Sequence, residues 1–300
     1  IILLNYLAHA LRWRVILFPL KRIKISGLFS PIFVGNLGNL FPVRAGPVIR
    51  AYLLGKKYAI PFSSSLATVV VLRLFDVFFH LGLFAWVFIF HAHVFSSEMV
   101  FFEESFRSLA VKFGQFSAVA VAIAVVLTYL LAFHEEKFLV LVRWVTQYLP
   151  QKWQEKIIFR IDQFNRGLIV LKNVRSLVKI TFYSALEWAA NVLSYYPLYW
   201  AYGLEDKSIA SLLVLTVMVS IVVNALPTPA FFGSFNLAVL IALHGIMGEA
   251  EVVAVSFGMV AWAIKFVVPF ILAVYFILHD YLSVSKLMQV IGEGRPVPEK

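Results

Sequence analysis

Long runs of apolar residues, separated by short polar segments, dominate the hydrophobic pattern of this chain. A membrane-spanning helix needs about 20 mostly apolar residues. Four stretches meet that length, namely 60–94, 109–133, 177–203 and 252–281, and residues 1–20 form a partial fifth. The pattern predicts an all-α polytopic membrane protein, whose first helix begins outside this numbering.

Two further apolar stretches are interrupted by proline and glycine. The segment 28–42 is too short to cross a bilayer comfortably, and the segment 209–247 is long but broken. The interrupting residues are Pro31, Gly35, Gly38 and Pro42 in the first segment and Pro227, Pro229 and Gly233 in the second. Irregular backbone is tolerated at membrane depth only where protein buries it or where it lines a wet cavity. Both segments are therefore interpreted as re-entrant or broken helices.

The distribution of Lys and Arg indicates which connections face the cytoplasm. Basic residues cluster at 21–24, at 44–57 and between 137 and 179, whereas 96–105, 204–206 and 248–251 are acidic or nearly free of them. Cytoplasmic loops carry the excess of basic residues. The first broken segment is then expected to enter and leave from the cytoplasmic side, and the second from the outer side. This arrangement predicts an inverted repeat, in which two discontinuous helices meet and form the substrate site.

The two halves of this repeat are separated by a basic, amphipathic segment. We interpret 1–134 and 177–282 as the halves, 135–176 as a cytoplasmic linker and 283–300 as a cytoplasmic tail of one transmembrane domain, 1–300. The linker has apolar residues at helical spacing with Lys and Arg on its other faces. It is expected at the inner leaflet, either in the head-group layer or packed on the bundle.

Composition shows that lipid must solvate most of the surface. The chain is 61% hydrophobic and only 14% charged, against about 25% charged residues in soluble domains. Its 26 Lys and Arg against 16 Asp and Glu favour anionic lipid head groups as partners. No nucleic-acid-binding module is recognisable. The absence of cysteine excludes disulfides and thiolate metal sites, and no cofactor or metal is expected.

Four ionisable residues fall deep inside the predicted spanning helices. They are Arg73, Asp76, Glu187 and Lys265. A charge at that depth costs about 2.5 to 3.5 kcal/mol unless it is paired or hydrated, so all four are expected to face inward. Arg73 and Asp76 share one helix face and can form an ion pair. Glu187 and Lys265 lack a local partner, and are expected either to pair across the bundle, for example with each other, or to line a polar cavity.

Polar residues also accompany both broken segments. Arg44 and Arg50 lie close to a chain reversal around Gly46, where guanidinium groups suit a phospholipid or lipid-linked phosphate. The alternative is that these arginines only set the topology. The side-chain amides of Asn224 and Asn236 flank the second break and suit loose backbone groups or a head group. The candidate substrate-contacting residues are Asn39, Arg44, Gly46, Arg50, Arg73, Asp76, Glu187, Asn224, Pro227, Pro229, Gly233, Asn236 and Lys265.

Three motifs carry a family resemblance. They are GNLFPVRAGPVIRAYLL at 38–54, SxAxVVVLRLFD at 65–76 and ALPTPAFFGSFN at 225–236, which is followed by a helix bearing Lys265. These motifs resemble the transmembrane region of lysylphosphatidylglycerol synthases and its stand-alone flippase-like relatives. The chain departs from the family pattern where glutamates are usual, at Pro47, Leu72 and Asn236, and where a Gly-rich break is usual, at Phe231-Phe232-Gly233.

The resemblance implies translocation of lipid. Two-domain members of that family make an aminoacyl phospholipid in a soluble C-terminal domain and flip it with a membrane domain similar to this chain. No such domain follows residue 281 here, so aminoacyl transfer is not expected of the chain itself. We therefore expect a lipid flippase or lipid transporter in a prokaryotic inner membrane, with a lipid-synthase partner and oligomers both compatible with the sequence.

Two alternatives remain at this point. The first is a membrane-embedded transferase that acts on a lipid-linked phosphate, and the second is a non-transporting scaffold for a lipid synthase. No HExxH, GxSxG or Walker motif occurs in the chain, which favours a transporter over an enzyme.

Overall fold

A computed structural model shows the protein as a bundle of α-helices. It describes residues 1–38, 45–90, 100–101, 104–105, 119, 126, 159, 166–226 and 228–280. Within these ranges the only extended pairing joins two-residue strands, β1 (Val100–Phe101) and β2 (Glu104–Ser105). The prediction of an all-α protein is confirmed.

Three described helical segments are long and apolar enough to span a membrane. They are Phe62–Val87, Pro229–Ile246 and Glu251–His279. The first and third correspond to the spans predicted at 60–94 and 252–281. Apart from two isolated positions, the span predicted at 109–133 lies outside the described residues, as do most of the linker and the whole tail.

The first half of the chain folds into a helix, a helical hairpin and a long helix. Its elements are α1 (Ile2–Leu17), α2 (Ser26–Leu37), α3 (Gly46–Tyr58) and α4 (Phe62–Phe90). Helices α2 and α3 pack against each other. A Cβ atom at Gly38 would lie only 2.8 Å from the backbone nitrogen of Gly46, so glycine allows the end of α2 to approach the start of α3 closely.

The predicted span 177–203 is divided into two helices. They are α8 (Val174–Leu193) and α9 (Tyr196–Ala201), and the 3-10 turn η3 (Ile169–Lys172) precedes them. The Asn173 side chain caps α8 by accepting hydrogen bonds from the backbone of Arg175 and Ser176. Pro197 occupies the first turn of α9. Proline has no N–H group and its ring clashes with the carbonyl one turn earlier, so a continuous helix is interrupted here.

The second broken segment forms another helical hairpin, followed by the long helix α12. Its elements are α10 (Ile209–Ala225), η4 (Pro229–Phe231), α11 (Ser234–Leu240), the π-helical η5 (Ile241–Ile246) and α12 (Glu251–His279). Between α10 and α11 the φ angle is positive at Ala230 (53°), Phe231 (59°) and Gly233 (85°). Left-handed backbone of this kind breaks the helix, because L-residues form only right-handed helices readily.

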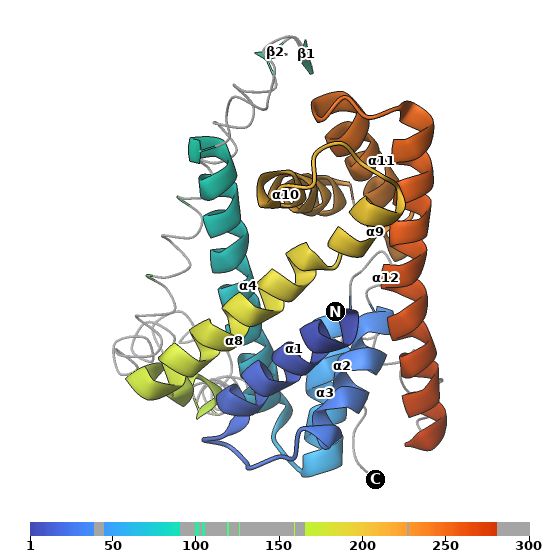
Figure 1. Ribbon diagram of the computed structural model, residues 1–300. Coiled ribbons are helices and arrows are strands. Elements are labelled where there is room, and N and C mark those ends of the chain that lie inside the picture. Colours follow the sequence, from blue (N-terminus) through green and yellow to red (C-terminus); the bar gives the residue numbers. More distant parts are fainter. Residues whose placement is uncertain are drawn as a thin grey trace, which may run out of the picture.

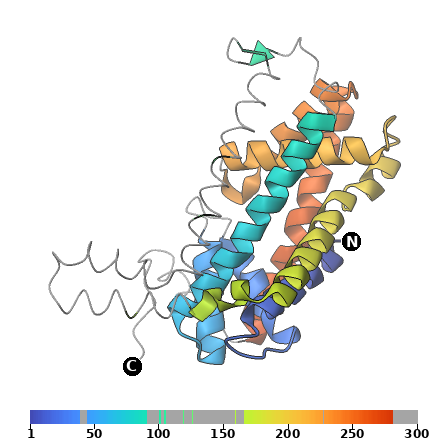
Figure 2. The ribbon, with the colours of Figure 1, turned by 90° about the vertical axis from the view of Figure 1, so that its left-hand side faces the viewer.

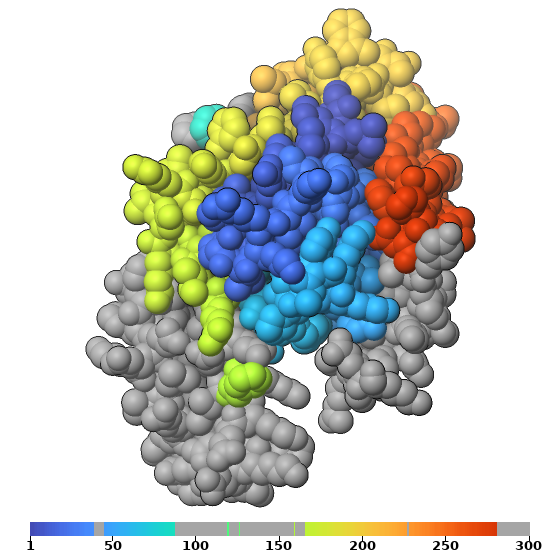
Figure 3. Space-filling view, turned by 90° about the horizontal axis from the view of Figure 1, so that it is seen from below, coloured from blue at the N-terminus to red at the C-terminus, as the bar shows by residue number. Residues whose placement is uncertain are grey.

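The two halves interlock. Helix α1 packs along α8, α2 packs against α12, and α4 contacts α10. Figure 1 shows α4 and α12 on opposite sides of the bundle, and Figure 2 shows α10 crossing between their upper parts. Seen from below in Figure 3, the first-half helices lie between α8 and α12. Helices of each half therefore pack against helices of the other, and a site at the boundary contains residues from both halves.

Two large apolar clusters hold these elements together. One is built by α9 to α12 with the end of α4, and includes Tyr199, Leu212 and Phe257. The other is built by α1 to α4 with η3 and α8, and includes Trp13, Leu54 and Ile180. Many large side chains elsewhere on α8 and α12 are exposed, as expected for helix faces that lipid solvates.

Candidate functional site

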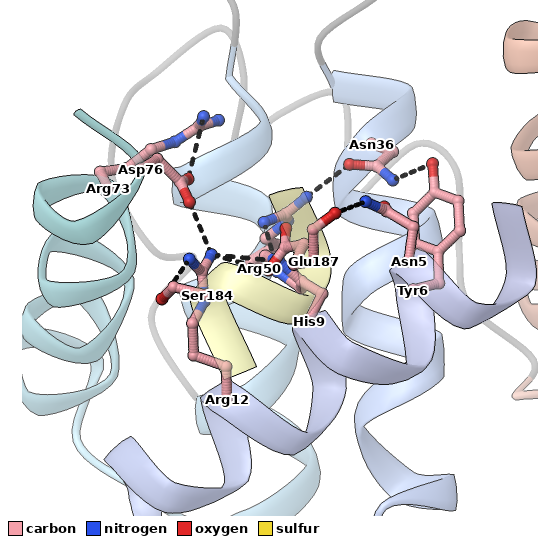
Figure 4. Close-up of polar contacts among 10 residues, drawn as sticks. All are labelled: Asn5, Tyr6, His9, Arg12, Asn36, Arg50, Arg73, Asp76, Ser184 and Glu187. Carbon is pink, nitrogen blue, oxygen red and sulfur yellow. Dashed lines mark hydrogen bonds and ion pairs between the residues drawn. The ribbon is translucent and has the colours of Figure 1, made fainter. Parts of the chain in front are cut away.

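A polar network lies between helices of both halves. Figure 4 shows it extending from Arg73 and Asp76, across α1 and α8, to Asn36 and Tyr6. Helix α1 contributes Asn5, His9 and Arg12, which recur at intervals of four and three residues and therefore share one face. Buried polar groups are costly in a low-dielectric interior unless they are paired, so this face of α1 requires partners on the neighbouring helices.

Arg12 is the centre of the network. Its side chain is fully buried, and its Nη2 lies 2.7 Å from Asp76 Oδ1 and 3.2 Å from Glu187 Oε2. Its Nη1 donates a hydrogen bond of 3.1 Å to Ser184. One guanidinium thus contacts two carboxylates, offsets one of their two negative charges, and joins α1, α4 and α8.

The ion pair expected between Arg73 and Asp76 is present but long. Arg73 Nη1 lies 3.8 Å from Asp76 Oδ2, and half of the Arg73 side chain is exposed. Asp76 makes its short contact with Arg12 instead. Sequence analysis did not include Arg12 or His9 among the candidates. Their three-residue spacing on an apolar helix was the signal that could have identified them.

His9 connects the Arg12 centre to Arg50. Its Nδ1 lies 2.9 Å from Glu187 Oε1, and its Nε2 lies 3.1 Å from Arg50 Nη1. Because a guanidinium can only donate, Nε2 accepts from Arg50, and the ring proton on Nδ1 is donated to Glu187. A longer approach of Arg12 Nη2 to the same Nδ1, at 3.4 Å, competes poorly with this bond. The partners therefore assign a neutral His9.

Arg50 is buried among neutral partners. Besides His9, it donates from Nη2 to Asn36 Oδ1, and Asn36 donates in turn to the Tyr6 hydroxyl at 3.2 Å. Its Nε atom is buried and has no hydrogen-bond partner among the described residues. In the described part of the chain, Arg50 forms no ion pair with a carboxylate. Its side chain runs across α2 at Gly35, where an added Cβ would lie 2.2 Å from Arg50 Cγ.

Lys265 is a second cation with neutral partners. It lies near the middle of α12, donates a 2.9 Å hydrogen bond to Asn191 Oδ1, and has its Nζ 3.7 Å from the centre of the Tyr195 ring. Neither partner carries a charge at neutral pH. The suggested pairing of Lys265 with Glu187 is not present, because Glu187 contacts His9 and Arg12.

A cavity of about 270 Å³ opens beside these cations, between the two hairpins. Tyr6, Asn36 and Lys265 supply its polar lining. Its apolar lining comes mainly from α10, the second break and α12, including Trp262, Phe266 and Phe270. The Trp262 and Phe266 rings stack 5.1 Å apart, and Trp262 Nε1 donates to the Ala230 carbonyl at 2.9 Å. The second break is thereby fixed against α12.

Comparison with known proteins identifies the family. Residues 1–273 match the model of the lysylphosphatidylglycerol synthase TM region. The chain belongs to this family. Glycosyltransferase AglD of Haloferax volcanii is 40% identical over 77 residues, which are 25% of this chain and 12% of that protein. The match thus covers only a small part of AglD. No solved structure matches the chain.

Membership of this family, together with the three apolar helices, identifies an integral membrane protein. The family name, which refers to a phospholipid synthase, points to a function related to membrane lipids. Within the described ranges, no cluster of three or more His, Asp or Glu residues has the geometry of a metal site.

The remaining predicted site residues are distributed around the cavity and the breaks. Pro229 and Gly233 are exposed at the second break. Asn224 is also exposed and donates to the Ser220 carbonyl at 2.7 Å. Asn236 Oδ1 is buried without a hydrogen-bond partner among the described residues. Gly46 begins α3, while Asn39, Arg44 and Pro227 lie outside the described residues.

Proposed function

We propose that this protein moves a membrane lipid between the two leaflets, and that the lipid head group passes through the cavity beside Lys265. One observation carries the proposal: the cavity lies where the two broken segments meet, and two cations, the buried Arg50 and the partly buried Lys265, stand at its polar side without a carboxylate partner among the described residues. The apolar lining suits acyl chains, and the cations suit a phosphate.

The position of the cavity agrees with an inverted-repeat transporter. Asn36 and Leu37 come from the first hairpin, whereas Ala230 and Phe235 come from the second. In such transporters the substrate site forms at the repeat interface from discontinuous helices. We propose accordingly that both hairpins are re-entrant, the first from the cytoplasm and the second from the outer side.

The proposed mechanism divides the contacts into a fixed part and a movable part. The ion pairs of Arg12 join α1, α4 and α8, so these helices are expected to move together. The contact of α2 with α12 is mainly apolar and includes the Phe33 and Phe276 rings, stacked 5.9 Å apart. Rocking at this contact, which would also break the partly exposed ion pair of Lys57 with Asp280, is proposed to open the cavity to either leaflet.

Arg44 and Arg50 are proposed to capture the head group at the inner leaflet before it reaches Lys265. We propose accordingly that the linker, the tail and the basic loops lie on the cytoplasmic side of a prokaryotic inner membrane, as their excess of Lys and Arg supports. A lipid synthase that supplies the substrate is a suitable partner.

Reconstitution of the full chain into liposomes tests the proposal. Phospholipids labelled on an acyl chain are added, and an impermeant reductant bleaches the label in the outer leaflet. Active protein is expected to bring the inner-leaflet label into reach of the reductant, and Lys265→Met is expected to slow this exchange strongly. Lys179→Met removes an exposed charge of α8 and serves as the matched control. Failure to move any labelled phospholipid or polyprenyl lipid, under all gradients tested, contradicts the proposal.

A transferase acting on a lipid-linked phosphate is the second candidate, because AglD is named a glycosyltransferase. Such an enzyme needs a free carboxylate as a base. Both Asp76 and Glu187 contact Arg12, which disfavours this role. Formation of a lipid-linked product that Glu187→Gln abolishes, with the lipid distribution and the thermal stability unchanged, would favour the enzyme.

A further inference from the structure

The charges around the cavity indicate which head groups it accepts. We infer that the cavity selects a lipid with a net negative head group, a phosphodiester without an amine, over zwitterionic and cationic lipids. This inference takes the cavity of the proposed function as the lipid site, and it rests on how the charges of the described residues are paired.

Lys265 is a cation that lines the cavity. An ammonium group has three donors, and among the described residues one hydrogen bond is formed, to Asn191. The Tyr195 ring adds a cation–π contact at 3.7 Å. These neutral partners hold the ammonium in place but leave its charge uncompensated. A partly buried charge of this kind favours an anionic partner, and the adjoining cavity supplies the space for one.

Arg50 lies behind Asn36, a polar residue of the cavity wall. Its guanidinium contacts His9 and Asn36, and both of these partners are neutral. Asn36 itself lines the cavity, so Arg50 stands directly behind the cavity wall. Through His9, Arg50 is also linked to Glu187, and its charge balances the negative charge that Asp76 and Glu187 retain beyond Arg12, so the polar wall carries no net negative charge.

The carboxylates of the polar network are held away from the cavity. Asp76 and Glu187 share the guanidinium of Arg12, and neither of them lines the cavity. No acidic side chain occurs among the described residues of the cavity wall. The two carboxylates are thus offset within the protein by the two buried guanidinium groups, of Arg12 and Arg50, whereas the charge of Lys265 faces the cavity.

These charges discriminate between head groups. The phosphate of phosphatidylglycerol can accept a hydrogen bond from Lys265 and offset its charge. The rest of this head group adds no cation. The amine of phosphatidylethanolamine or of an aminoacyl lipid would stand beside Lys265 with no carboxylate to receive it. Two positive charges in contact repel each other strongly in a low-dielectric site.

A binding experiment with no transport step tests this selectivity. The purified full chain in detergent is titrated with fluorescent, tail-labelled phosphatidylglycerol, and the anisotropy gives the affinity. Unlabelled phosphatidylglycerol, phosphatidylcholine and phosphatidylethanolamine with identical acyl chains then compete, alongside inorganic phosphate. Phosphatidylglycerol is expected to bind about tenfold more tightly than either zwitterionic lipid, because all three share the phosphodiester but the zwitterionic lipids bring a second cation close to Lys265.

Variants assign the selectivity to the cavity. Lys265→Met is expected to weaken phosphatidylglycerol binding about tenfold. Phosphatidylcholine binding is expected to stay unchanged, and this unchanged binding shows that the variant is folded. Lys265→Arg retains the charge and should retain the preference. Lys179→Met, with a charge removed elsewhere on the protein, should behave as the wild type. If Lys265→Met does not fold, Lys265→Gln provides the same comparison.

The outcomes separate this inference from the proposed function. Equal affinity for all three phospholipids, or a preference that survives in Lys265→Met, overturns the charge selectivity even if lipid transport is observed. Binding of inorganic phosphate as tight as that of phosphatidylglycerol assigns the site to a free anion and not to a lipid. Selective binding of phosphatidylglycerol without transport upholds the selectivity and contradicts the proposed function.

Discussion

Arg12 Nη2 lies 2.7 Å from Asp76 Oδ1, whereas Arg73, one turn from Asp76 on the same helix, approaches that carboxylate only to 3.8 Å. Arg12 and Asp76 are 64 residues apart in the chain. The closer partner is the buried one, since the Arg12 side chain is fully buried and the Arg73 side chain is half exposed. The ion pair that stabilises this region therefore joins two helices.

The first prediction concerns the difference between these two arginines. Arg12→Met leaves Asp76 and Glu187 buried without their shared counter-charge, and is expected to lower the free energy of unfolding by about 3 to 5 kcal/mol. Arg73→Met removes a half-exposed partner and should cost less than about 1 kcal/mol. Unfolding in mixed detergent micelles, followed by circular dichroism, measures both. Equal effects would show that Arg12 is not the main partner.

The second prediction concerns Trp13 and Thr68. Trp13 Nε1 donates a 3.0 Å hydrogen bond to the hydroxyl of the buried Thr68. Thr68→Val keeps the shape of the side chain but leaves the indole N–H without an acceptor, so a loss of about 1 to 3 kcal/mol in unfolding free energy is expected. Thr68→Ser retains the hydroxyl and is the control. A stable Thr68→Val variant would argue against this bond between α1 and α4.

The third prediction concerns Gly35 and the position of Arg50. An added Cβ at Gly35 would lie 2.2 Å from Arg50 Cγ, whereas one at Gly82 would have no neighbour within 4 Å. Gly35→Ala is therefore expected to displace the Arg50 side chain and to slow lipid transport in liposomes. Gly82→Ala should leave transport unchanged, and should even stabilise α4 by up to about 1 kcal/mol through its helix propensity. Similar transport by both variants would remove Arg50 from the proposed path.

The fourth prediction concerns pH and the link between α3 and the end of α12. Lys57 Nζ lies 2.7 Å from Asp280 Oδ2. Partial burial raises the pKa of Asp280, but hydrogen bonds from Lys57, Ser30 and His279 outweigh this effect and lower the pKa to about 2. A carboxyl group with a lowered pKa in the folded state stabilises the protein above its unfolded pKa of about 4. That contribution is lost as the pH falls through about 2.

Comparison of the wild type with Asp280→Asn measures this contribution. The difference in unfolding free energy should be below about 1 kcal/mol, because Lys57 is partly exposed. It should stay constant from neutral pH down to roughly pH 5 and then shrink toward zero. A difference that instead grows on acidification would contradict the assigned pairing.

The sequence by itself determined where the chain is apolar, where it is broken and which charges must turn inward. The spans at 60–94 and 252–281 were recognised because a long apolar run has few solutions other than a helix in lipid. The breaks at Gly38 and Gly233 were recognised because proline and glycine interrupt helices locally. Membership of the family followed from the same local motifs.

Only the tertiary structure decided which polar groups meet. The sequence did not identify His9, Arg12, Asn36 or Asn191 as candidates, because short-range spacing does not show which helices pack together. The contact of Lys265 with Asn191 joins residues 74 positions apart, and that of His9 with Glu187 joins residues 178 positions apart. A charge's depth is a property of its own helix, whereas its partner depends on how the helices pack against one another.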